Sequence, residues 1–102
     1  MEVNRRTWNT PKGNVVGVQT KWPGFNILIV TGSKGFLACP AIDIIACSRY
    51  GAAAAIVKST PDNPIGTLDR FPNRKITKVN EKARKLGLKV GMPASDAFAL
   101  IA

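Results

Sequence analysis

A cysteine and an aspartate lie where the sequence offers the best opportunity for chemistry. Cys39 ends an apolar segment, and Asp43 follows it after Pro40, a residue that suits the first turn of a helix. The dipole and free backbone amides of a helix N-terminus make a nearby thiol more reactive and can hold an anion. Asp43 could then orient or deprotonate a ligand. The sequence therefore offers a small-molecule or catalytic site at Cys39 and Asp43, with Thr67 as a third candidate if the fold brings it beside them.

The same residues also have a purely structural interpretation. Cysteine is among the most frequently buried residue types, and aspartate in a first helical turn stabilises the helix without any chemistry. The chain contains no histidine, which excludes nucleophile pairs that need an imidazole base. Cys39 and Cys47 do not have a recognisable zinc spacing, and Cys47 is expected to pack in the core. We expect no metal and no cofactor, and the sequence leaves open whether the chain is an enzyme.

A basic segment near the C-terminus is the second candidate for function. Its cations could attract phosphates, and a nucleic-acid partner would then be held with steep salt dependence. No aromatic residue is interleaved with them, and no known nucleic-acid-binding motif is present. A solvated helix face explains the charge equally, so a nucleic-acid partner is possible but not favoured. The cations between residues 74 and 89 are Arg74, Lys75, Lys78, Lys82, Arg84, Lys85 and Lys89, opposed by Glu81; we take Lys78, Lys82, Lys85 and Lys89 as the polyanion-contact candidates.

The composition indicates one small globular unit. The chain has 102 residues, of which 45% are hydrophobic, and its formal net charge is +9. This length supports one core, so residues 1–102 are expected to form a single domain. The longest apolar run, residues 52–57, is far shorter than the roughly 20 residues of a membrane span, and no apolar signal segment follows Arg5 and Arg6. We expect a cytoplasmic protein with reduced thiols and no membrane partner.

The first third of the sequence is typical of β-strands. Residues 14–20 and 25–31 are rich in β-branched and aromatic side chains, with a turn at Trp22 to Gly24 between them. Residues 2–8 and 36–39 are expected to add two further strands, which gives an antiparallel meander. We expect residues 1–31 to be the oligomerisation region, because exposed edge strands and the two tryptophans suit a subunit contact. Residues 32–102 are expected to form an α/β part.

The pattern then changes to a helical period. Residues 40–49 are expected to form a helix and residues 52–57 a buried strand, which together with 36–39 make a βαβ crossover in a mixed sheet. Residues 59–66 have the composition of a loop. The remaining elements expected are a helical turn at 68–71, a helix at 81–86 capped by Asn80 and Gly87, a short strand at 88–90, and a helix at 94–101 opened by Pro93. The fold class expected is α+β.

Three segments together resemble a known family. They are Gly35 to Asp43, Thr67 to Asp69 and Gly87 to Met92, in this order and spacing, and the likeness runs from about Asn14 to the C-terminus. The chain resembles the YunC-like family of bacterial and archaeal domains of unknown function. The resemblance implies a small mixed α and β domain whose N-terminal strands mediate assembly into a tetramer, and it implies no reaction. The chain departs from the family pattern at Pro40, where glycine is more usual, at Pro93, which replaces a capping serine, and at residues 60–66, an apparent insertion.

Overall fold

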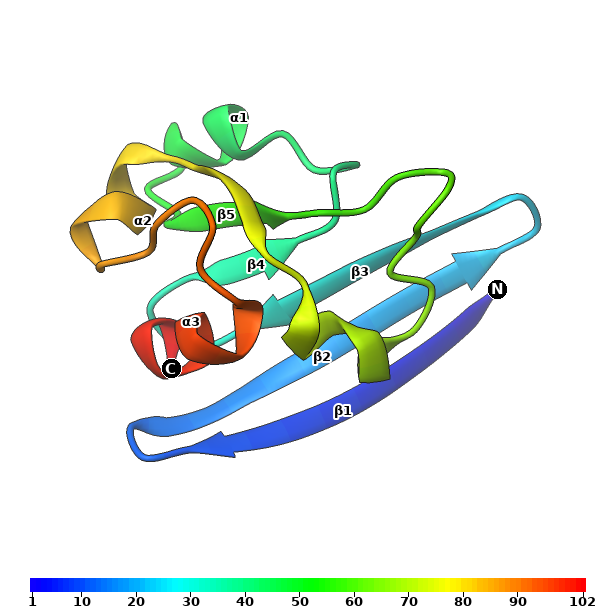
Figure 1. The fold of residues 1–102 in the computed structure, drawn as a ribbon, viewed down its shortest axis with the longest axis horizontal. Helices are drawn as coiled ribbons and strands as arrows, with labels where there is room; N and C mark the ends of the chain where they lie inside the picture. The colour runs from blue at the N-terminus through cyan, green and yellow to red at the C-terminus, as the bar shows by residue number, and fades with distance from the viewer.

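Six strands form one mixed sheet, in which each strand lies beside the next one in the chain (Figure 1). The computed structural model describes residues 1–102. Only β4 and β5 run parallel, and all other neighbours are antiparallel. With the short helices, this confirms the α+β class. The strands are β1 (Glu2–Thr10), β2 (Gly13–Trp22), β3 (Phe25–Thr31), β4 (Phe36–Ala38), β5 (Ala54–Val57) and β6 (Ile76–Val79).

The N-terminal meander is confirmed. β1 and β2 form a long hairpin whose register runs from Glu2 opposite Lys21 to Thr10 opposite Gly13. β2 turns into β3 through Pro23 and Gly24, and Gly24 has φ +90, a conformation that glycine adopts without strain. The β2–β3 turn therefore brings Trp22 and Phe25 to the same end of the sheet.

The crossover is confirmed, but its helix begins later than expected. α1 spans Ile44–Ser48, and its N-cap is Asp43, whose side chain accepts hydrogen bonds from the backbone N–H groups of Ile45 and Ala46. Pro40 therefore precedes the helix and does not lie in its first turn. Asp43 has extended backbone angles, as an N-cap residue does, so the helix can begin only at the residue after it.

The C-terminal helices form as expected, and one strand was placed wrongly. The 3-10 helix η1 (Leu68–Asn73), α2 (Glu81–Lys85) and α3 (Ala94–Ile101) are all present. The expected strand at 88–90 is absent, because the N–H of Leu88 donates to the carbonyl of Ala83 and this segment closes the end of α2. The sixth strand is β6, which pairs with β5.

The two faces of the sheet are covered differently. Odd residues of β2 and even residues of β3 are buried on the inner face, which α3 and η1 cover (Figure 1). On the outer face, α1 packs against β4 and β5 around Ile44, Ala54 and Ile56. Over β1 to β3 the outer face keeps apolar side chains only half-buried, among them Val16 and Val18. No helix is long and apolar enough to cross a membrane.

Candidate functional site

Cys39 lies at the floor of a cavity beside the β2–β3 turn. Its backbone N–H donates to the carbonyl of Leu28 at 3.0 Å, which extends the β3–β4 ladder by one residue. The residue is 6% exposed and belongs to the main core. Four residues separate it from the start of α1, so the thiol does not adjoin the helix N-terminus as the sequence suggested.

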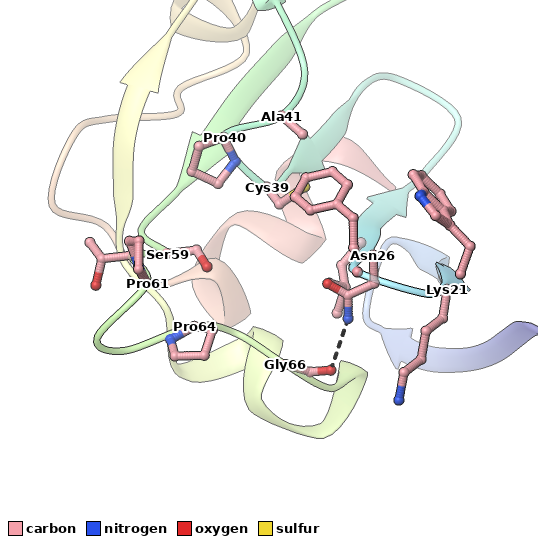
Figure 2. A pocket seen from close by; sticks show the side chains of 14 residues that line it. Lys21, Asn26, Cys39, Pro40, Ala41, Ser59, Pro61, Pro64 and Gly66 are labelled. Carbon is pink, nitrogen blue, oxygen red and sulfur yellow. Dashed lines mark hydrogen bonds between the residues drawn. The ribbon is translucent and has the colours of Figure 1, made fainter.

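The cavity over Cys39 is a cleft of about 660 Å³. The β2–β3 turn forms one side of it, the segment after β4 the second, and the loop before η1 the third (Figure 2). Its lining residues are Lys21, Trp22, Gly24, Phe25, Asn26, Leu28, Cys39, Pro40, Ala41, Ser59, Thr60, Pro61, Pro64 and Gly66. Of these, only Cys39 is a candidate site residue from the sequence. The others come from segments far apart in the chain, and the sequence does not show that these segments meet.

Two polar side chains have defined roles in the cleft. The amide of Asn26 donates to the carbonyl of Gly66 at 3.4 Å, which ties β3 to the opposite loop (Figure 2). The Oγ atom of Ser59 accepts from the N–H of Ile65 at 3.1 Å. No carboxylate lines the cleft, and Lys21 contributes the only side-chain cation. The lining therefore suits a ligand that is neutral or negatively charged.

The other two candidates from the sequence do not join Cys39. Asp43 is exposed and uses Oδ1 to cap α1, at 3.0 and 3.1 Å from its two backbone donors. It lines a separate depression of about 300 Å³, together with Lys78. Thr67 precedes η1, makes no side-chain capping hydrogen bond and is exposed. Neither residue lines the cleft over Cys39.

Cys47 packs against apolar side chains, in agreement with the prediction that it belongs to the core. It is half-buried, and it lies against the outer-face cluster beneath α1. Both cysteines are free thiols.

The four polyanion-contact candidates are all exposed but come from different elements. Lys78 lies on β6, Lys82 and Lys85 lie on α2, and Lys89 lies in the turn that follows it. In the same segment Arg84 pairs with Glu81 at 3.1 Å. The basic segment therefore spans a strand and a helix of one and a half turns, and it does not form one helical face.

Arg74 does not line the cleft, but it holds the loop that forms one of its walls. Its guanidinium donates to the backbone carbonyls of Asn63 and Pro64 at 2.8 and 2.7 Å, and to the side-chain oxygen of Asn63 at 3.1 Å. These bonds hold the loop that carries Ser59 and Pro64. Nothing in the sequence pattern distinguishes this arginine from its neighbours.

Asn80 connects α1, β5 and α2. As the sequence predicted, its side chain caps α2, accepting from the N–H of Ala83 at 3.0 Å. It also accepts from the N–H of Ala54 and donates to the carbonyls of Ile44 and Ala52. The capping motif in the sequence does not predict these last three hydrogen bonds, which connect α1 to the β5 region.

Comparison with known proteins places the chain in a family. A family model described as a domain of unknown function, DUF1805, matches residues 38–101, which is more than half of the chain. The chain belongs to the DUF1805 family. The matched residues of this DUF1805 chain include Cys39 and all elements from α1 to α3, while β1 to β3 and most of β4 lie outside the match.

The fold has also been seen in a crystal structure. A protein of unknown function, TA1206 from Thermoplasma acidophilum, is similar to the DUF1805 chain with a TM-score of 0.84 and 17% sequence identity. The likeness covers 99% of this chain and 94% of that one, so it includes the N-terminal strands. No curated protein matches. At this identity the likeness shows the fold alone.

Proposed function

We propose that this DUF1805 chain works as a homo-oligomer that assembles through the outer face of β1 to β3. The observation that carries the proposal is an apolar sheet face that no helix of the chain covers. The register places Val3, Val16, Val18, Ile27 and Ile29 on this face, which we call the open face. Ile27 also packs against the main core and Ile29 against the cluster beneath α1, so Val3, Val16 and Val18 are its least covered apolar residues.

The register supports a continuous patch. Val18 lies opposite Ile29 on one side and opposite Arg5 on the other, while Thr20 lies opposite Val3 and Ile27. Residues directly opposite in antiparallel strands point to the same face, so these side chains form one surface across three strands. Val3 is 58% exposed. The face therefore mixes aliphatic side chains with Arg5 and Thr20, and mixed apolar and polar surfaces are common at contacts between proteins.

The two tryptophans lie in different places: Trp8 packs on the inner face of the sheet, and Trp22 lies at the β2–β3 turn. Trp8 packs on the inner face against Phe98, with 5.1 Å between ring centroids, and Arg6 lies over its ring. Trp8 is therefore engaged within the chain and does not support a subunit contact. Trp22 is half-buried and stands edge-on to Phe25 at the end of the sheet.

The assembly has a direct test in which one charge is placed on the open face. Wild-type protein is expected to be an oligomer by light scattering at micromolar concentration. Val18→Lys is expected to give monomers, because a desolvated ammonium on each copy opposes association. Ser95→Lys adds the same charge at an exposed position on α3 and should leave the mass unchanged. A monomeric wild-type protein, or a Val18→Lys protein of unchanged mass, would refute the proposal.

The finer features of the family resemblance are also part of the proposal. The likeness to YunC-like domains supports a tetramer, and light scattering distinguishes it from a dimer. Two free thiols support a location in a reducing compartment such as the cytoplasm. Labelling of both thiols in protein purified without reductant would support that location, and an intact disulfide would contradict it.

A further inference from the structure

We propose that the cleft over Cys39 binds a small organic anion with a flat apolar body. The site is separate from the proposed self-association and stands or fails independently of it. Its volume of about 660 Å³ lies within the range of pockets that hold small molecules.

The body of the ligand is indicated by the apolar surfaces of the cleft. Leu28 and Cys39 form its floor and are 2% and 6% exposed. Three prolines contribute further apolar surface from the segment after β4 and from the loop before η1. Prolines hold a fixed backbone shape, so little conformational entropy is lost when a ligand enters.

An aromatic pair makes the cleft favourable for a flat molecule. Trp22 and Phe25 stand edge to face with 5.7 Å between ring centroids, and both line the cleft. Phe25 is nevertheless 52% exposed. An exposed aromatic ring beside a cavity gains by contact with another ring, through both burial and ring geometry.

The negative charge of the ligand follows from the charges of the lining. Lys21, an exposed residue at the rim, is the only charged residue of the lining, and no aspartate or glutamate lines the cleft. Ser59 accepts a hydrogen bond from the N–H of Ile65, which leaves its own O–H free to donate to a ligand. Figure 2 shows Ser59 and Asn26 on opposite sides of the cavity. The cleft thus has an apolar floor, a cationic residue at its rim and a hydroxyl donor on one wall, without a competing carboxylate.

The experiment compares two fluorescent probes that differ in charge. 1-Anilinonaphthalene-8-sulfonate carries a sulfonate, and N-phenyl-1-naphthylamine has the same aromatic frame without it. We expect wild-type protein to bind the sulfonate more tightly, and Lys21→Met to weaken sulfonate binding by roughly two- to five-fold with little effect on the neutral probe. Phe25→Ala should weaken both probes by about ten-fold.

Two controls make the outcome decisive. Val18→Thr alters the open face and should leave both probes unaffected, which separates the cleft from the oligomer surface. Far-UV and near-UV circular dichroism identify any variant that binds the probes only because it is loosely packed. Binding that responds to Val18→Thr but not to Phe25→Ala would overturn the proposal. Equal binding of the two probes to wild-type protein would disprove the preference for an anion.

Discussion

Replacing the side-chain amide nitrogen of Asn80 with an oxygen should lower the stability of the fold substantially. The Asn80 side chain is 2% exposed and all of its hydrogen-bonding groups are used. The oxygen accepts from the N–H groups of Ala54 and Ala83 at 3.1 and 3.0 Å, and the amide nitrogen donates to the carbonyls of Ile44 and Ala52, each at 3.0 Å. Asn80→Asp preserves the shape and both acceptor bonds. It replaces the two donated bonds with an oxygen that faces two carbonyl oxygens.

The expected loss can be worked out from these contacts. A buried carbonyl that loses its donor costs about 1–3 kcal/mol, and the bond to Ala52 is only partly buried, so the two losses together cost about 2–4 kcal/mol before the buried charge is counted. A domain of this size has a free energy of unfolding of roughly 5–15 kcal/mol. A loss of about 3 kcal/mol lowers the melting temperature by roughly 10–25 °C. We therefore expect Asn80→Asp to remain folded only marginally at neutral pH.

The measurement is urea unfolding followed by circular dichroism. Asn4→Asp, which makes the same chemical change at an exposed position on β1, is the matched control and should unfold close to wild type. Below about pH 4 the introduced carboxyl is protonated and can again donate to one carbonyl, so the gap between the two variants should narrow. If the two variants unfold at the same urea concentration at neutral pH, the hydrogen-bond reasoning is wrong.

Three further predictions concern the candidate site and the basic segment. Arg74→Met removes the bonds that hold the cleft wall, so it should weaken binding of the sulfonate probe several-fold while the oligomer mass is unchanged; tighter binding would contradict this. Iodoacetamide should modify Cys47 before Cys39 in native protein, as peptide mass spectrometry will show, because Cys39 is the more buried of the two; faster labelling of Cys39 would instead favour a reactive thiol. Any retention on an RNA resin should be lost at moderate salt and reduced by charge reversal of Lys82 and Lys85, whereas retention that survives both changes would indicate a specific nucleic-acid site.

Local patterns in the sequence were enough for most of the fold. Alternating β-branched residues and a Pro-Gly turn predicted β2 and β3, and the change to a helical period predicted a crossover. Asn80 and Pro93 marked the starts of α2 and α3 correctly. The errors lie where a short segment had no strong pattern: β6 has only four residues, and residues 88–90 resemble a strand but close a helix.

The candidate site was less accessible from the sequence because its parts come from distant segments. Cys39 was found because of its residue type and its place after a strand. Asn26 and Ser59 gave no signal, because neither belongs to a motif and their proximity depends on how the loop before η1 folds back toward β3. Asp43 and Thr67 were plausible neighbours of Cys39 in the sequence, but the late start of α1 commits Asp43 to capping.

The sequence by itself determined most of the element types, because periodicity is a local property of the chain. It also excluded imidazole chemistry, because the chain contains no histidine. It also showed that the positive charge is concentrated in one segment. The tertiary structure alone decided that the outer face of β1 to β3 stays open while α1 covers β4 and β5, and that a cleft without carboxylates forms over Cys39. Those outcomes depend on the packing of residues far apart in the chain, and such packing is decided by the whole core at once.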